Sequence, residues 1–362
     1  MKKAIFAVFL LLSATKVAAQ SPYIYKVWEY CPAPGQFVNT MPEYEPGDTP
    51  DAIRLKAEEL IANNACSLVT LGGYGGYIVF GFDHMIENKP GQYDIQITGN
   101  AFYSDKLSTG EKGGSCEPGI VMVSYDANGN GLPDDEWYEL AGSEYGSSET
   151  IHNYTITYYR PDENKTTTPH PTEVYITDIT YVKWTDNQGE EGYVFRNAFH
   201  KQPYYPQWID SDELQFNGTR LADNYVDTSG DGSYYVQFAY PWGYADNHPN
   251  TAEESKLNIN WAVDANGNPA NLPGAHFFKV YTGVNQYCGW LGETSTEIQG
   301  AYDLHLYGGD TDDPNAYTNA IRQPANSTSV VQQTFTTLTG IRTVKPTAPG
   351  IYIVNGKKIV IK

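Results

Sequence analysis

The chain has 362 residues and a formal net charge of −20, because 43 Asp and Glu residues outnumber 23 Lys and Arg residues. Such an acidic chain repels phosphate groups, so nucleic acid is not expected as a partner. With 30 Tyr, 34 Gly and only 18% charged residues, the composition favours many short strands joined by tight turns, in one large or two medium-sized domains.

The first 19 residues have the features of a secretory signal peptide. Lys2 and Lys3 form a basic start, residues 4–12 are apolar, and small residues at 17–19 suit a cleavage site. We therefore expect export, to the extracellular space or the outer cell surface. The apolar run is too short to span a bilayer, and no transmembrane segment is expected in the mature chain.

An exported chain can form disulfides, and it has four cysteines: Cys31, Cys66, Cys116 and Cys288. The sequence does not choose among the three possible pairings, and four free thiols are an equal alternative. No C-x-x-C or Cys/His spacing is present, which argues against a zinc site.

One helix is predicted, at residues 50–64. Asp48 or Thr49 is placed to cap it, and apolar residues recur at helical spacing from Ile53 to Ile61. From residue 68 onward the pattern is that of strands. Two Gly-Gly pairs at 72–76 precede a strand rather than a helix, so they argue against a phosphate-binding loop.

Further strands are predicted where β-branched and aromatic residues run between turn signals, at 93–102, 119–126, 154–160, 173–184, 192–199, 234–240, 257–264, 276–284 and 301–308. Their spacing predicts a mostly β fold, a β-sandwich or jelly roll over residues 20–308. Residues 160–172 either divide two lobes or form a long loop. Residues 309–339 are expected to be a linker or mobile loop, and 340–362 to end in a hairpin turning at Asn355-Gly356.

The segment "DANGNGLPDDEW" (126–137) places six oxygen-bearing side chains and two glycines in twelve residues. Calcium prefers six to eight oxygen ligands on a short loop. The ligands that we predict for a structural calcium ion are Asp126, Asn128, Asn130, Leu132 through its carbonyl, and Asp134, Asp135 or Glu136. An EF-hand loop has Glu at its twelfth position, where this chain has Trp137, so an EF-hand is not predicted. The alternative is a plain Asn/Gly turn.

Two weaker relatives of this loop occur later in the chain. "DTSGDG" repeats the alternate spacing with Asp227, Ser229 and Asp231, and "DANGNP" repeats it with Asp264, Asn266 and Asn268. Pro269 replaces a glycine in the second, so a hairpin turn is the better interpretation there.

Catalytic signals are few. Glycoside hydrolysis needs two carboxyl groups across a cleft, and Glu293 and Glu297 are candidates after Trp290. No G-x-S-x-G motif is present, and the seven His lie in no shared motif. We therefore predict no catalytic residue and keep a glycan-active hydrolase as an alternative.

Aromatic residues are concentrated in polar, turn-rich segments. Such rings can stack on sugar faces or on a flat cofactor, although they can equally close the ends of a sandwich. The rings that we predict to bind a ligand are Tyr204, Tyr205, Trp208, Trp242, Tyr244, Tyr287 and Trp290.

Five segments, 29–39, 71–102, 115–145, 197–209 and 278–298, resemble secreted cell-surface proteins of Bacteroidetes, some of which carry a PKD-type domain. The resemblance covers most of residues 25–306 and implies an association with corrinoid uptake loci. The tail 350–362 resembles the last strands of a type IX secretion sorting domain, without the Ig-like body that normally precedes them. The family supplies no catalytic residues.

These observations favour non-catalytic capture of a small molecule, a glycan or a corrinoid, at the cell surface. The protein would bind structural Ca²⁺ and could pass its ligand to outer-membrane uptake machinery. A structural or adhesion protein is the third alternative. A binder would present clustered rings without a facing carboxyl pair, and an adhesin would present neither.

Overall fold

The computed structural model describes residues 19–108 and 110–308, together with the backbone of four short strands between 335 and 361. The predicted signal peptide (except residue 19), most of the predicted linker at 309–339 and the Asn355-Gly356 turn lie outside the described residues. The described part is mostly β, with 37% strand and 9% helix, so this part of the expected fold class is confirmed.

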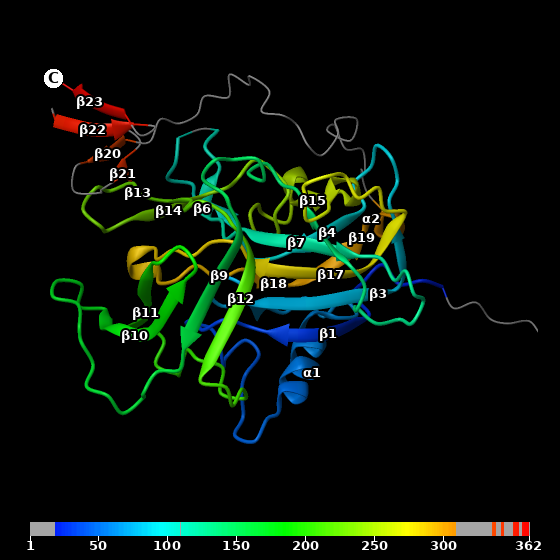
Figure 1. The fold of residues 1–362 in the computed structure, drawn as a ribbon, viewed down its shortest axis with the longest axis horizontal. Coiled ribbons are helices and arrows are strands. Elements are labelled where there is room, and N and C mark those ends of the chain that lie inside the picture. The colour runs from blue at the N-terminus through cyan, green and yellow to red at the C-terminus, as the bar shows by residue number, and fades with distance from the viewer. Residues whose placement is uncertain are drawn as a thin grey trace, which may run out of the picture.

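The largest sheet runs through the middle of the molecule and has six antiparallel strands (Figure 1). In spatial order they are β1 (Lys26–Cys31), β3 (Tyr77–Glu87), β17 (Gly274–Thr282), β7 (Gly119–Ser124), β8 (Trp137–Leu140) and β16 (Ala262–Val263).

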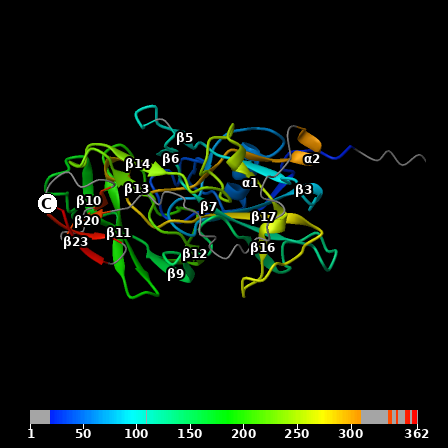
Figure 2. The same cartoon turned by 90° about the horizontal axis from the view of Figure 1, so that it is seen from above.

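A second sheet of four strands lies at one end of the first, as both Figure 1 and Figure 2 show. Its strands are, in order, β11 (Glu191–Asn197), β10 (Ile176–Asp186), β9 (Ile151–Tyr159) and β12 (Glu213–Arg220). Residues 160–172 join β9 to β10, which are neighbours in this sheet, so the segment is a loop within one sheet.

The remaining sheets are small. Their strands are β13 (Tyr225–Asp227), β14 (Tyr235–Phe238), β6 (Gly113–Ser115) and β5 (Phe102–Tyr103); β15 (Lys256–Leu257), β4 (Ile95–Thr98) and β19 (Gly300–Asp303); and β18 (Glu297–Ile298) with β2 (Val69–Thr70). Toward the C-terminus, β21 (Arg342–Thr343), β20 (Phe335–Thr337), β22 (Gly350–Val354) and β23 (Lys357–Ile361) form another sheet. The strands expected in the tail, β22 and β23, pair antiparallel.

The expected β-sandwich or jelly roll is wrong. The small antiparallel sheets form a four-blade ring that resembles a β-propeller. The reason is that alternation along the chain marks strands but not their partners. β3, for example, pairs with β1 on one side and with β17 on the other, although about 190 residues separate β3 from β17.

Helix α1 (Pro50–Ile61) begins where the sequence predicts. The Thr49 hydroxyl accepts a hydrogen bond of 3.2 Å from the Ala52 N–H, so Thr49 is the cap. The helix ends three residues earlier than expected, at Ile61. A short second helix, α2 (Leu304–Tyr307), replaces the end of a predicted strand, and 3-10 turns form at Glu253–Ser255, Ile259–Trp261 and Gly289–Leu291.

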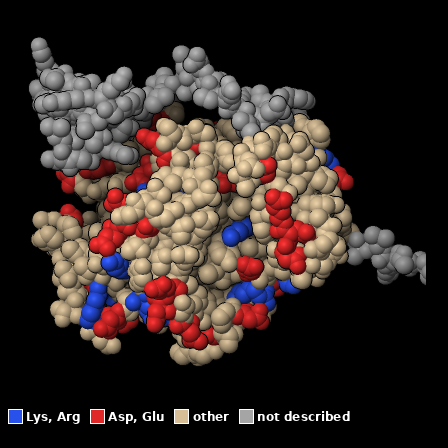
Figure 3. Space-filling view, viewed as in Figure 1, with Lys and Arg blue, Asp and Glu red and all other residues tan. Residues whose placement is uncertain are grey.

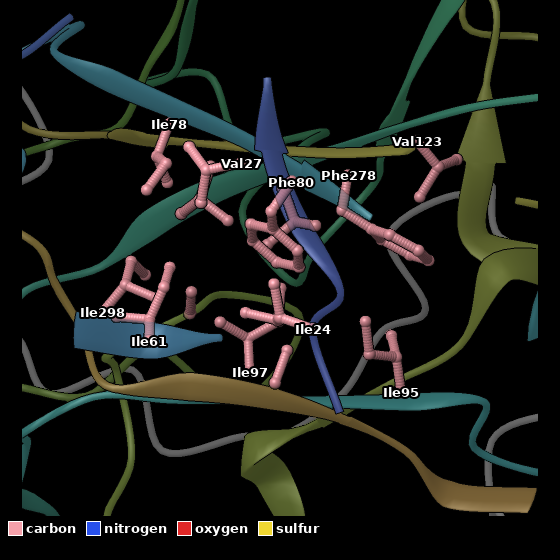
Figure 4. Close-up of a cluster of buried hydrophobic side chains, with 14 of the residues drawn as sticks. Ile24, Val27, Ile61, Ile78, Phe80, Ile95, Ile97, Val123, Phe278 and Ile298 are labelled. Atoms are coloured by element: carbon pink, nitrogen blue, oxygen red, sulfur yellow. The ribbon is translucent and has the colours of Figure 1, made fainter. Parts of the chain in front are cut away.

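Two clusters of buried side chains hold these elements together. The first lies between the six-stranded sheet on one side and α1, β4 and β18 on the other (Figure 4). The second joins the six-stranded sheet to the sheet β9–β12 and is rich in tyrosine; it includes Tyr74, Tyr154, Tyr158, Tyr204, Tyr205 and Tyr281. Burial of these aromatic rings stabilises the junction.

Red carboxylate side chains outnumber blue basic ones on the face drawn in Figure 3, as the composition requires.

All four cysteines are free thiols. Within the described residues, no helix has the length and apolar character needed to cross a membrane.

Candidate functional site

Most of the rings predicted to bind a ligand are parts of the core. Tyr204 and Tyr205 have no exposed surface, and Tyr244 and Trp208 are 2% and 5% exposed. Trp242 packs against the first core cluster, with its ring centroid 4.6 Å from that of Trp261. The predicted platform of exposed rings is therefore wrong for these residues, because proline-rich turns direct the rings into the junctions between sheets. Only Trp290 is substantially exposed among the predicted rings, and Trp242 and Tyr287 are half-buried.

The predicted calcium loop is an exposed turn between β7 and β8. The Asp126 carboxylate accepts hydrogen bonds from the Asn130 and Gly131 N–H groups, at 3.1 and 2.9 Å. The Asn128 and Asn130 side-chain amides both donate to Asp134. Asp126, Asn128, Asn130 and Asp134 thus gather at one point, whereas Glu136 accepts from the Tyr138 hydroxyl. The calcium ion itself stays a prediction.

The two related loops follow the same scheme. The Asp227 carboxylate accepts from the Gly230 and Gly232 N–H groups, and Asp264 accepts from the Asn266 and Asn268 N–H groups, at 2.8–3.0 Å. In each loop the first Asp stabilises the turn by itself, which is what Asp in tight turns commonly does.

Glu293 and Glu297 belong to different sites. Glu293 lines a small cavity, where no other described lining residue is acidic. Glu297 is fully enclosed in a group of three carboxyl groups with Glu117 and Asp246. Glu297 does not line this cavity, so the two residues do not form the two-carboxyl cleft expected of a hydrolase.

A larger cavity, of about 560 Å³, lies where the outer face of the six-stranded sheet meets β9 and β12. We call it the Glu139 pocket. Its floor comes from β8, because Trp137 and Glu139 are two positions apart and therefore lie on the same face of the strand. Met122, which pairs with Glu139 across β7 and β8, extends the floor. Cavities of about 300–1,000 Å³ are typical of small-molecule sites.

The carboxyl group of Glu139 is the central polar group of the pocket. Burial raises its pKa to about 7, and a hydrogen bond of 2.5 Å from the Thr219 hydroxyl partly opposes this shift. Thr219 lies on β12, and its N–H donates to the Tyr281 hydroxyl at 2.8 Å. Near neutral pH, Glu139 can therefore either donate or accept a hydrogen bond.

The wall next to Thr219 is aromatic. The Tyr145 ring packs against the His152 ring, with centroids 4.7 Å apart, and both line the pocket. The Nδ1 atom of His152 lies 3.3 Å from the Thr219 hydroxyl, and Nε2 lies 3.1 Å from the Tyr145 carbonyl. Asn153 and Asn217 add amide groups to the lining. The pocket thus combines apolar rings with a few polar groups that can orient a ligand.

Two predicted loops border this pocket. The loop 126–136 leads directly into Trp137, and Asp264, Asn266 and Gly267 of the third loop are part of the lining. The predicted loops therefore lie beside the Glu139 pocket, and the pocket itself is not predicted. In the sequence, Trp137 stands out only as a mismatch to the EF-hand pattern. The sequence pattern that indicates the pocket is the placement of Trp137 and Glu139 two positions apart on one short strand, since both side chains then lie on the same face.

A buried group of three carboxyl groups could hold a metal ion. Ligand oxygens of Glu117, Asp246 and Glu297 all lie within 4.8 Å of one another, and we call this group the acidic trio. Burial, followed by the charges of its neighbours, raises the pKa of Glu117 and of Asp246 well above the usual range. Burial raises the pKa of Glu297 to about 7. Like charges so close together need protons or a cation to neutralise them.

Two carboxyl groups of the trio, those of Asp246 and Glu297, are also fixed by other contacts. Asp246 accepts hydrogen bonds from the N–H groups of Asn100, Ala101 and Glu297, at 2.8–2.9 Å. Glu297 accepts from the hydroxyl groups of Thr70 and Ser295. Sequence reasoning named Glu297 but missed its two partners, since Glu117 and Asp246 are far from it in the chain.

A scan of known protein families finds no family model that matches this chain, and a search of curated proteins finds no match.

Proposed function

We propose that this protein is a non-catalytic ligand-binding protein of the cell surface or extracellular space, and that it captures a short glycan in the Glu139 pocket. The observation that carries the proposal is a cavity of about 560 Å³ in which aromatic rings and hydrogen-bonding groups face the same space. Sugars present an apolar ring face and a rim of hydroxyl groups, so they need both kinds of contact.

Specific residues have distinct parts in this proposal. Trp137 and Tyr145 would stack on sugar faces, and Glu139 would bind a hydroxyl group together with Asn153 and Asn217. A half-protonated Glu139 suits this role because a hydroxyl group is both a donor and an acceptor. Corrinoid capture and delivery to outer-membrane uptake machinery, which the resemblance implies, belong to the same class of function and enter the test below as alternative ligands.

The test is a thermal-shift and calorimetry screen of glycans and cobalamins against the mature protein, since a ligand that binds the folded state raises its melting temperature. We expect a glycan to bind and Trp137→Ala to weaken binding about tenfold or more, because removing an aromatic anchor costs ~2 kcal/mol. Trp290→Ala, an exposed ring outside the pocket, is the matched control and should leave affinity unchanged.

Two results would overturn the glycan proposal. One is that no glycan binds at saturating concentration. The other is that binding occurs but Trp137→Ala and Trp290→Ala affect it equally. A cobalamin that binds in the absence of any glycan signal would move the function to corrinoid capture, and absence of both would favour an adhesion protein.

A hydrolase is the second candidate, and one observation favours it. The pKa of Glu139, about 7, lies where a general acid at neutral pH has it. Incubation of a bound glycan followed by an assay for new reducing ends separates the two functions. A hydrolase would release them, and Glu139→Gln would abolish the release while the glycan still binds.

A structural cation completes the proposal. All donors of the acidic trio are oxygen atoms. A site made of carboxylate oxygens suits calcium better than it suits zinc or copper. Glu117, Asp246 and Glu297 would hold the ion, which would cross-link three segments that are distant in the chain. We also retain the loop 126–136 as a proposed calcium site, because its ligands would fix the turn that precedes Trp137.

A further inference from the structure

A second cavity, of about 100 Å³, lies apart from the Glu139 pocket, and we call it the Glu293 cavity. Its walls come from β9, β10 and β11, from residues 73–74 before β3, and from residues 284–294 after β17. Five of the lining residues carry aromatic rings: Tyr74, Tyr158, Trp184, Tyr193 and Tyr287.

Three polar atoms of the lining residues are buried without a partner. Oε1 of Glu293 accepts a hydrogen bond of 2.6 Å from the Gln36 N–H, but Oε2 has no partner, although the residue is only 7% exposed. The hydroxyl groups of Tyr74 and Tyr287 are also without a partner. Buried polar groups are nearly always paired, and an unpaired one destabilises the folded state. A ligand or ordered water that pairs with Glu293 and Tyr287 would remove this destabilisation.

The negative charge around the Glu293 cavity favours a cation over an anion as its ligand. None of the described residues that line it is Lys or Arg. Glu297 of the acidic trio is close enough to Glu293 for its charge to oppose ionisation of the Glu293 carboxyl group, together with the larger effect of burial. A cation in the cavity would pair with Glu293 and offset this repulsion, whereas an anion would add to it.

The aromatic rings of the cavity favour an organic cation over a metal ion. A bare metal ion needs several oxygen ligands, but Glu293 supplies the only carboxylate in the described lining. Alkylated ammonium groups instead bind against the faces of Trp and Tyr rings, usually with one acidic group nearby. The cavity of about 100 Å³ is smaller than the engineered cavity of about 150 Å³ that holds benzene, so it admits only a small group such as a trimethylammonium headgroup. Tyr193, which is 38% exposed, and the half-buried Trp184 provide the way in from solvent.

We propose that the Glu293 cavity binds a small organic cation, an alkylated ammonium group, with the Glu293 carboxylate as its counter-ion and the surrounding Tyr and Trp rings as its wall. This site is separate from the glycan pocket and does not depend on it. The cation could be free in solution or the end group of a larger molecule, and the shared chemistry is that of a headgroup such as choline.

The test uses choline and its neutral carbon isostere, 3,3-dimethylbutanol, in calorimetry with the mature protein. We expect choline to bind, and the isostere, which has the same shape without the charge, to bind at least tenfold more weakly. Glu293→Gln keeps an acceptor for the Gln36 N–H but removes the charge, and it should weaken choline binding about tenfold or more.

Further variants are included so that the result does not depend on whether Glu293→Gln folds. Tyr193→Ala alters a partly exposed wall residue and should weaken choline binding as well. Glu190→Gln removes one exposed negative charge from the hairpin between β10 and β11 and is the control for net charge. Trp137→Ala should leave choline binding unchanged, which separates this site from the Glu139 pocket.

Three outcomes would overturn the proposal. The first is no binding of choline at millimolar concentrations. The second is equal binding of choline and the neutral isostere, which would indicate an apolar cavity. The third is binding that Glu293→Gln and Tyr193→Ala do not weaken more than Glu190→Gln does, which would place the cation elsewhere.

Discussion

The hydroxyl group of Thr219 donates a hydrogen bond of 2.5 Å to the carboxyl group of Glu139, although 80 positions separate the two residues. Thr219 lies in the sheet β9–β12 and Glu139 lies in the six-stranded sheet. The bond therefore crosses the junction between two sheets, and it fixes the main polar group of the larger cavity.

Removing this bond should move the titration of Glu139. Thr219→Val keeps the shape of the side chain but loses the donor, and the bond lowers the pKa of Glu139 in the wild type. We expect the apparent pKa to rise above about 7 in the variant. Carbon-13 NMR of the Glu carboxyl groups measures it, and an unchanged or lower pKa would show that the hydroxyl does not stabilise the carboxylate.

Glu139 should also make stability depend on pH. Its pKa is about 4.5 in an unfolded chain and about 7 when folded, so the unfolded state loses its proton first as pH rises. Stability therefore falls between pH 4.5 and 7, by ~2 kcal/mol once solvent screening of a half-buried group is allowed for. Glu139→Gln should show a correspondingly smaller fall. Urea titrations at pH 4.5, 6 and 8 check this.

The Glu139→Gln comparison isolates one residue, because Glu297 has a raised pKa of about 7 and contributes in the same direction in both proteins. Equal slopes for wild type and variant over this range would mean that Glu139 is ionised normally in the folded state.

The acidic trio should respond to chelation. If a cation neutralises Glu117, Asp246 and Glu297, EDTA should lower the melting temperature at pH 8 by several degrees. The effect should be smaller at pH 5, where protons compete with the cation for the same oxygen atoms. Glu297→Gln should largely abolish the response, whereas Glu191→Gln, an exposed residue, should not. If EDTA has no effect and Glu297→Gln stabilises the protein, the trio shares protons instead.

The loop 126–136 needs a separate measurement, because Asp126 supports the turn with or without an ion. Asp126→Ala should lower the melting temperature and reduce the part of the calcium response that persists in Glu297→Gln. Asp264→Ala removes the same kind of turn contact in a loop where no ion is predicted, and it should leave the calcium response intact. Identical calcium responses of Asp126→Ala and wild type would remove calcium from this loop.

Local features of the fold could be predicted, whereas its assembly could not. The start of α1, with Thr49 as its cap, depends on neighbouring residues, and so does the strand character of most predicted segments. The pairing of β3 with β17 depends on contacts that no local pattern encodes, so the sheets were assigned to a sandwich.

The candidate sites follow the same division. Polar turns such as 126–136 are visible in the sequence, because the ligands are close together in the chain. Glu117, Asp246 and Glu297 converge from three distant segments, and neither their burial nor their proximity has a local signature. The prediction of exposed rings at 204–208 is wrong because a polar, proline-rich context resembles a surface, although Tyr204 and Tyr205 are fully buried.

The Glu139 pocket, where Thr219 and Glu139 join the two sheets, has a mechanical consequence. The residues of the Glu139 pocket extend from Met122 to Tyr281 and are contributed by both sheets, so neither sheet can form the pocket by itself. A molecule held there would act as a clamp between the two, and its departure would be the first step in separating them. Resistance to pulling the sheets apart should therefore depend on occupancy of the pocket.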